Sequence, residues 1–195
     1  MTIKQRLLKS AYPFLMWVSG LKNTSSKIKV NVNNIHPPVS IYAVKATLIN
    51  DSQFSMASLK GKKILLVNTA SDCGYTNQYE DLEKLYKKFE GKLVVLGFPA
   101  NDFKEQENGT NEAIASFCTI NFGVTFPLMK KSSVVKNAAQ NEVFKWLNDA
   151  SKNGWNNQAP VWNFSKYLVD ETGGLTHYFD PSVPPLSEEV LKAIE

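Results

Sequence analysis

Two continuous apolar runs constrain this chain most strongly. One is KILLVNT at residues 63–69, and the other is LVVLGF at residues 93–98. Uninterrupted runs of this length, bounded by turn residues, are typical of strands that are buried on both faces of a parallel sheet. Residues 77–89 lie between them and repeat large apolar side chains every three or four positions, which predicts an amphipathic helix. Residues 63–98 are therefore predicted to form a strand, a crossover helix and a second strand.

The remaining segments predict further elements on both sides of this unit. These are an edge strand at residues 41–48, a helix capped by Asn111 that runs to about Cys118, a helix at residues 142–150, a hairpin formed by residues 167–170 and 175–178, and a last helix opened by Ser187. The order of the elements predicts an α/β protein in which helices flank a central mixed β-sheet. A thioredoxin-like fold has this arrangement.

The first 40 residues differ from the rest, so we divide the chain into an N-terminal extension and linker at 1–40 and a domain at 41–195. The extension combines basic residues with a short apolar stretch at 11–18. That stretch is shorter than the roughly 20 residues needed to span a bilayer. Residues 23–40 are polar and contain a Pro-Pro pair, which is typical of a linker.

Three interpretations of the extension stay open: a weak signal peptide, a short helix on a membrane surface, or a helix packed on the domain. Pro13 interrupts the apolar stretch and weakens the first of these. We expect a cytoplasmic protein, with a periplasmic location or membrane association through residues 1–22 as the alternative.

Composition excludes several classes of ligand. The net charge is +4, from 22 basic and 18 acidic residues that are mixed along the sequence. A nucleic-acid-binding protein usually gathers its basic residues on one face, so we expect no nucleic-acid partner. His36 and His177 are the only histidines and have no companion cysteine spacing, so no metal site is expected. There is also no glycine-rich phosphate loop, and we expect no cofactor.

Cys73 is one of only two cysteines and follows the first buried strand directly, just before the amphipathic helix. This position is expected to bring its sulfur close to a helix N-terminus, whose free N–H groups favour a thiolate. Gly74 leaves the approach to the sulfur open. The alternative is a buried structural cysteine at the end of a strand.

Three blocks in the same order carry a family resemblance. LLVNTASDCGYTNQYEDLEKLYKKF, LGFPANDFKEQENGTNEAIASFCTINFGVTFPL and VWNFSKYLVDETGGL resemble the conserved segments of the glutathione peroxidases, over residues 41–195. The resemblance implies a thiol peroxidase in which Cys73 attacks the peroxide. It also implies that Trp162 and Asn163 match the family's catalytic Trp–Asn pair, where their N–H groups stabilise developing charge.

Asp102 departs from the family pattern, because the family usually has a glutamine at this position. A carboxylate beside the sulfur would oppose thiolate formation. Asp102 therefore points away from the sulfur, accepts or carries a proton, or is itself held protonated. We keep it as a candidate catalytic residue.

Cys118 matches the resolving cysteine of the two-cysteine members of the family. The resemblance implies that Cys73 is oxidised to a sulfenic acid by hydrogen peroxide or by an organic or lipid hydroperoxide. A disulfide with Cys118 then forms, and thioredoxin or a similar dithiol reduces it. Because a disulfide requires Cα atoms within about 7 Å, we expect the helix that carries Cys118 to unwind locally. The alternative is a one-cysteine cycle with glutathione.

Two other functions compete with turnover of peroxide. A redox sensor would pass the oxidation of Cys73 to a partner protein. A thioredoxin-like disulfide oxidoreductase is disfavoured, because Thr76 stands where the second cysteine of a C-x-x-C pair would be. Tetrameric family members carry an extra loop before the Trp–Asn pair, and this chain is short there, so we expect a monomer.

Overall fold

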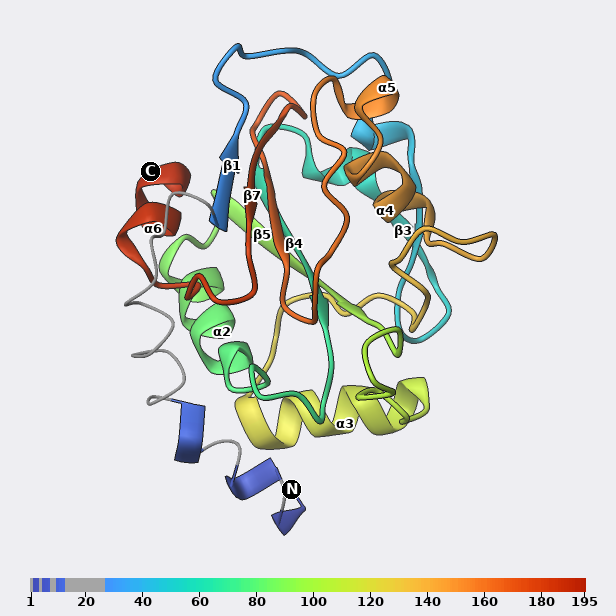
Figure 1. Ribbon diagram of the computed structural model, residues 1–195, viewed down its shortest axis with the longest axis vertical. Coiled ribbons are helices and arrows are strands. Elements are labelled where there is room, and N and C mark those ends of the chain that lie inside the picture. The colour runs from blue at the N-terminus through green and yellow to red at the C-terminus, as the bar shows by residue number, and fades with distance from the viewer. Residues whose placement is uncertain (1, 4, 8–9, 13–26) are drawn as a thin grey trace.

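The computed structural model describes residues 2–3, 5–7, 10–12 and 27–195 (Figure 1). Its main sheet has five strands in the order β1-β7-β6-β4-β5. β4 and β5 are parallel, whereas β1 with β7, β7 with β6 and β6 with β4 are antiparallel pairs. The strands are β1 (Ile28–Val30), β4 (Lys63–Thr69), β5 (Leu93–Pro99), β6 (Lys166–Val169) and β7 (Leu175–Phe179). The predicted mixed sheet is confirmed.

The apolar runs form β4 and β5 at the centre of this sheet, and helices cover both of its faces. Leu65 and Val67 point into one hydrophobic cluster, while Ile64 and Leu66 point into another. The first cluster receives side chains from α2 (Gln78–Lys88), α3 (Asn111–Phe122) and α6 (Glu188–Ile194), and the second from α4 (Glu142–Leu147). Side chains on both faces of these strands are apolar because helices cover both faces of the sheet.

Helix α3 lies across the end of the domain toward which the turn after β4 extends (Figure 1). The Thr110 side chain caps it by accepting a hydrogen bond from the Ala113 N–H over 3.3 Å. The prediction of Asn111 as the cap was therefore wrong by one residue. The helix also runs beyond Cys118, because its stop is Gly123, whose φ of 63° lies in the left-handed region that glycine tolerates.

Two predicted elements are divided in the structure. Residues 41–48 form a short 3-10 helix, η2 (Ile41–Ala43), and then β2 (Lys45–Thr47), which pairs with β3 (Gln53–Ser55) in a separate two-stranded sheet. A further 3-10 helix, η3 (Met56–Leu59), follows. Residues 142–150 divide into α4 and α5 (Ala150–Asn153), because the Asp149 side chain caps a new helix by accepting from the Ser151 N–H.

The expected linker contains the edge strand of the main sheet. β1 pairs with β7, with Lys29 opposite Tyr178. Three residues are too few to show an alternating pattern, and their pairing depends on backbone groups that sequence does not reveal. The prediction of a linker throughout residues 23–40 was therefore wrong at β1.

Part of the N-terminal extension is described. The Gln5 side-chain amide donates a hydrogen bond to the Ser71 carbonyl over 3.1 Å, and Tyr12 is buried. Most of the apolar stretch, at residues 13–18, lies outside the described residues, as do residues 19–26. Within the parts of the chain that the structure describes, no helix has the length and apolar character needed to cross a membrane.

Candidate active site

Cys73 lies in the tight turn that connects β4 to α2 and is only 1% exposed. Its backbone N–H donates to the Thr76 hydroxyl over 3.0 Å, and that hydroxyl donates to the Ala70 carbonyl over 2.9 Å. The Thr76 N–H returns a hydrogen bond to the Cys73 carbonyl. Thr76, which occupies the position of the missing second cysteine, therefore closes the turn that holds the Cys73 sulfur.

Hydrogen-bond donors surround the Cys73 sulfur. The backbone N–H of Tyr75 donates to it over 3.4 Å, and the side chains of Trp162 and Asn163 lie close enough to lower its pKa as donors. The structure therefore brings together three of the residues predicted from sequence: Cys73, Trp162 and Asn163.

Burial has the largest effect on the acidity of Cys73 and raises the pKa of its thiol above the ordinary value. The donors from Tyr75, Trp162 and Asn163 lower this pKa in part, whereas the negative charge of Asp72 raises it. The N–H groups thus favour the thiolate, as the sequence predicts, but they do not bring the pKa below its ordinary value in this conformation. The physical reason is desolvation, which outweighs the nearby N–H groups.

The segment that carries Trp162 and Asn163 is tied to the end of β4. Asn68 donates from its side chain to the Trp162 carbonyl over 3.1 Å and accepts at its own carbonyl from the Phe164 N–H. The Trp162 ring contacts Phe103, with ring centroids 5.5 Å apart. These contacts join residues far apart in sequence into one wall of the site.

The Asp102 side chain accepts hydrogen bonds from the loop that contains Ser133 and Val134. Its two carboxylate oxygens accept hydrogen bonds from the Ser133 hydroxyl over 2.8 Å and from the Val134 N–H over 2.7 Å. This arrangement corresponds to the first of the three placements that the sequence left open, in which Asp102 points away from the sulfur. The carboxylate whose charge acts on Cys73 is Asp72.

Gln106 was missed by the sequence analysis. Its side-chain Oε1 accepts a hydrogen bond from Nδ2 of Asn163 over 2.9 Å, and its backbone carbonyl accepts one from the Asp72 N–H over 3.0 Å. The signal that was available is a second polar side chain four positions after Asp102, in the same block. Gln106 contacts both the segment before Cys73 and the Trp–Asn pair.

Cys118 lies on the inner face of α3 and is completely buried. Burial raises the pKa of its thiol to about 12; the neighbouring Tyr79 side chain lowers this pKa in part, and the charge of Glu107 raises it. Both cysteines are free thiols and belong to the same hydrophobic cluster. Cys118 therefore shares a hydrophobic cluster with Cys73 and keeps its proton in this conformation.

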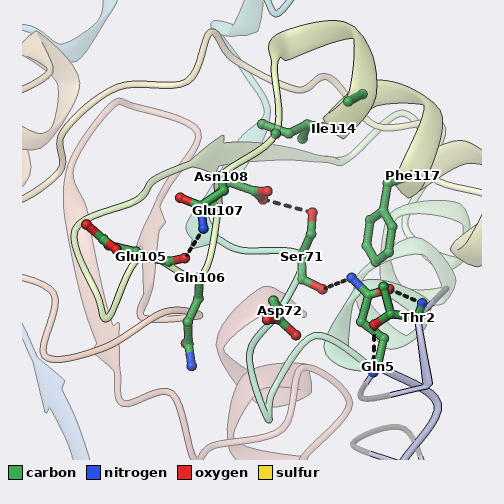
Figure 2. Close-up of a pocket in the computed structure, with 12 residues that line it drawn as sticks. Thr2, Gln5, Ser71, Asp72, Glu105, Gln106, Glu107, Asn108, Ile114 and Phe117 are labelled. Carbon is green, nitrogen blue, oxygen red and sulfur yellow. Dashed lines mark hydrogen bonds between the residues drawn. The ribbon is translucent and has the colours of Figure 1, made fainter.

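Glu107 is a buried carboxyl group beside this region and was also missed from sequence. It is 1% exposed and accepts a hydrogen bond from the Ser71 hydroxyl over 3.0 Å (Figure 2). Burial raises its pKa to about 7. Ser71 and Glu107 line a cavity of about 280 Å³ that α3 borders through Ile114 and Phe117. Space is therefore present between the Cys73 segment and the helix that carries Cys118.

No group of three or more His, Cys, Asp or Glu side chains among the described residues could hold a metal ion. The Cys73 site itself offers a thiol next to N–H donors.

Residues 41–148 match the family model described as glutathione peroxidase. The chain belongs to the glutathione peroxidase family. It is 44% identical to glutathione peroxidase-like peroxiredoxin GPX5 from Chlamydomonas reinhardtii, over 78% of this chain and 96% of that relative. It is 42% identical to glutathione peroxidase-like peroxiredoxin 2 from Saccharomyces cerevisiae, over 76% of this chain and 91% of that relative. The peroxidase class predicted from sequence is confirmed.

Solved structures of the family have the same architecture. The structure of Trgpx in its apo form covers 80% of this chain and 96% of its own chain, at 29% identity and a TM-score of 0.61. A thioredoxin-family thiol:disulfide interchange protein from Chlorobium tepidum covers 82% of this chain and 93% of its own, at 18% identity and a TM-score of 0.57. This second likeness concerns the fold alone, and the predicted thioredoxin-like fold is confirmed.

Proposed function

We propose that this glutathione peroxidase family member reduces hydroperoxides by a two-cysteine cycle in which Cys73 attacks the peroxide and Cys118 forms the disulfide. The observation that carries the proposal is the convergence of three donors, from Tyr75, Trp162 and Asn163, on the Cys73 sulfur. Such donors stabilise negative charge where it develops. A cysteine with only a structural role would not need them.

The first step oxidises Cys73. The Cys73 thiol gives up its proton and its sulfur attacks the terminal peroxide oxygen. The O–O bond breaks, and the leaving alkoxide or hydroxide takes up that proton and departs as alcohol or water. The sulfur becomes a sulfenic acid. Because burial raises the pKa of Cys73, the resting thiol keeps its proton, and the donors act mainly on the charge that forms during the attack.

The second step forms the disulfide. The Cys118 sulfur attacks the Cys73 sulfenic acid, the S–O bond breaks, and the hydroxide takes up the Cys118 proton and leaves as water. Cys118 is fully buried on α3, and its thiol has a pKa of about 12. Local unwinding of residues 111–119 would expose the thiol, lower this pKa and bring the two Cα atoms within the required distance of about 7 Å. The neighbouring cavity offers room for that movement.

The third step restores both thiols. A dithiol such as thioredoxin attacks the disulfide and leaves oxidised. This reductant is consistent with relatives named peroxiredoxins. We infer hydrogen peroxide and organic or lipid hydroperoxides as substrates and a monomer as the working form. A cytoplasmic location remains our expectation.

A coupled assay tests the cycle. Peroxide consumption is followed with thioredoxin, thioredoxin reductase and reduced pyridine nucleotide, and in parallel with glutathione, for the wild type and Cys118→Ser. We expect thioredoxin-driven turnover that Cys118→Ser abolishes. Glutathione-driven turnover that survives the substitution would contradict the role of Cys118 and favour the one-cysteine cycle. Oxidation of Cys73 without turnover by either reductant would favour a redox sensor.

A further inference from the structure

We propose that Lys166 is a positioning residue for the peroxidase reaction, and that it acts by holding the backbone that places Asn163 beside the Cys73 sulfur. This inference rests on the proposed function, because it concerns a donor to the sulfur that attacks the peroxide. Lys166 is the first residue of β6, three positions after Asn163, and its side chain plays no part in the steps described above.

Lys166 occupies a position where an apolar residue would be expected. It is 0% exposed, and the rest of β6 is apolar or aromatic. Leu168, two positions further on, points into the hydrophobic cluster that contains Cys73, so the Lys166 side chain enters the same face of the sheet. Burial lowers the pKa of the Lys166 ammonium to about 7, and the charge of Asp180 raises it in part. A charged group is costly to bury, so a lysine at this position requires bonds that offset the cost.

The Lys166 side chain donates to three backbone carbonyls. Its Nζ lies 2.8 Å from the Phe164 oxygen, 3.4 Å from that of Pro181 and 3.5 Å from that of Asp180. An ammonium has three N–H groups and no acceptor, so these carbonyls match what it can donate. The same Pro181 carbonyl also accepts from the Gln78 side chain over 2.7 Å. The start of β6, the loop after β7 and the first turn of α2 are thus joined at one point.

Phe164 connects this point to Asn163. It follows Asn163 directly, and its φ of 69° lies in the left-handed region that bulky residues seldom adopt. Such a conformation persists only where its surroundings maintain it. The Phe164 N–H donates to the Asn68 carbonyl over 2.6 Å, and the Phe164 carbonyl accepts from Lys166. Both backbone polar groups of this strained residue are therefore held, one by β4 and the other by the lysine.

The loop after β7 lies beside the turn that contains Cys73. The charge of Asp180 acts on the phenol of Tyr75, and the backbone N–H of Tyr75 donates to the Cys73 sulfur. Helix α2, which is joined to the same point, begins directly after this turn. Lys166 therefore connects the segment that carries Asn163 with the segment that carries Cys73. Without its bonds the Asn163 side chain would keep its N–H groups but lose its fixed place beside the sulfur.

A double-mutant cycle tests the proposal. Lys166→Met, Asn163→Ala and the double variant are prepared in the full chain carrying Cys118→Ser, so that only Cys73 is oxidised. Methionine fills most of the volume of the lysine stem but donates nothing to the three carbonyls. We expect Lys166→Met to slow single-turnover oxidation by hydrogen peroxide about tenfold, as for one hydrogen bond lost from a developing charge. In the Asn163→Ala background the same substitution should have almost no effect.

Alkylation by iodoacetamide separates positioning from a general disturbance of the turn. Lys166→Met should raise the pKa of Cys73, because the Asn163 donor lowers that pKa. At high pH, where the thiolate is fully formed, the alkylation rate should stay close to that of the parent, since alkylation places no charge on a peroxide oxygen. Oxidation by peroxide should remain slow at the same pH. A disturbed turn would change both reactions equally.

Lys63→Met is the matched control. The Nζ of Lys63 also donates to backbone carbonyls, those of Ala193 and Ile194 in the last turn of α6. Lys63 is the first residue of β4, whereas Cys73 follows the other end of that strand. The control substitution should therefore change neither the oxidation rate nor the pKa of Cys73. Lys166→Gln, whose amide is one bond shorter than the lysine side chain, replaces Lys166→Met if the latter does not fold.

An equal loss of rate from Lys166→Met with and without the Asn163 side chain would overturn the proposal. An unchanged rate and pKa in Lys166→Met would do so too, as would the same loss in Lys63→Met. Failure of the proposed function would look different, since the parent's Cys73 would then not be oxidised by peroxide at all. The alkylation measurement would still report whether Lys166 controls the pKa of Cys73 through Asn163.

Discussion

The backbone N–H of Tyr75 donates to the sulfur of Cys73 over 3.4 Å, two residues along the same turn. It has the largest of the effects that lower the pKa of Cys73, and burial still outweighs it. The resting site therefore holds a protonated thiol in an environment already arranged for a thiolate.

The first prediction concerns pH. Since the pKa of Cys73 is raised, the thiolate fraction should grow with pH throughout the neutral range, by about tenfold per pH unit below the pKa. Single-turnover oxidation of Cys118→Ser and its alkylation by iodoacetamide should both accelerate accordingly. Trp162→Phe, which removes a donor, should move the profile to higher pH. A rate that is already constant below neutral pH would contradict the raised pKa.

The second prediction concerns Asp102. Asp102→Ala should lower the free energy of unfolding by about 1–3 kcal/mol, because the Val134 N–H and the Ser133 hydroxyl lose their acceptor. Urea unfolding measures this loss, and Asp102→Asn, which keeps one acceptor oxygen, should lose less. The pKa of Cys73 should stay unchanged in both variants. A lower Cys73 pKa in Asp102→Ala would instead place the carboxylate beside the sulfur.

The third prediction concerns the buried carboxyl of Glu107. Its pKa is raised from 4.5 to about 7 in the folded protein, so the stability associated with its neutral form is complete below pH 4.5 and is lost as pH rises to about 7. Glu107→Gln should therefore be more stable than the wild type above pH 7, by up to about 3 kcal/mol, and similar to it near pH 4.5.

Unfolding by urea at several pH values checks this difference. Glu105→Gln is the control, because Glu105 is exposed on the same loop, so its replacement should leave the free energy of unfolding almost unchanged. If Glu107→Gln were equally destabilised at every pH, the carboxylate would be ionised and needed as an acceptor throughout.

The fourth prediction concerns the movement of α3. Disulfide formation should release the helix, so backbone amides of α3 should exchange with deuterium faster in the oxidised protein than in the reduced one. α2 serves as an internal reference, and peroxide-treated Cys118→Ser should keep the slow exchange of the reduced state. Equal protection of α3 in both states would show that the cysteines meet without unwinding.

Much of the fold follows from the sequence because its strongest pattern is local. Leu65 and Val67 face one cluster and Ile64 and Leu66 face the other, so β4 could be recognised from its composition alone. The edge strand β1 could not, since its three residues depend on pairing with β7. Its place is determined by backbone hydrogen bonds with a segment that lies about 150 residues further along the chain.

The site likewise contains residues that the sequence predicts and residues that it does not. Cys73, Trp162 and Asn163 were found because they lie in recognisable motifs, and the structure brings them together. Gln106 reaches Asn163 only through the left-handed backbone at Lys104 and Glu105, which no motif indicated. The net direction of the Cys73 pKa could not be predicted, because it depends on burial by residues remote in sequence, whereas the helix-terminus argument was local.

The most direct test of the central role of Cys73 is the intact mass of the reduced protein after one equivalent of hydrogen peroxide, with peptide mapping under non-reducing conditions. We expect the wild type to lose two hydrogen atoms and to contain a Cys73–Cys118 disulfide. Cys118→Ser should gain one oxygen atom at Cys73, and Cys73→Ser should remain unmodified. Oxygen added first at Cys118, or oxidation of Cys73→Ser as fast as of the wild type, would contradict the assignment of Cys73 as the residue that attacks the peroxide.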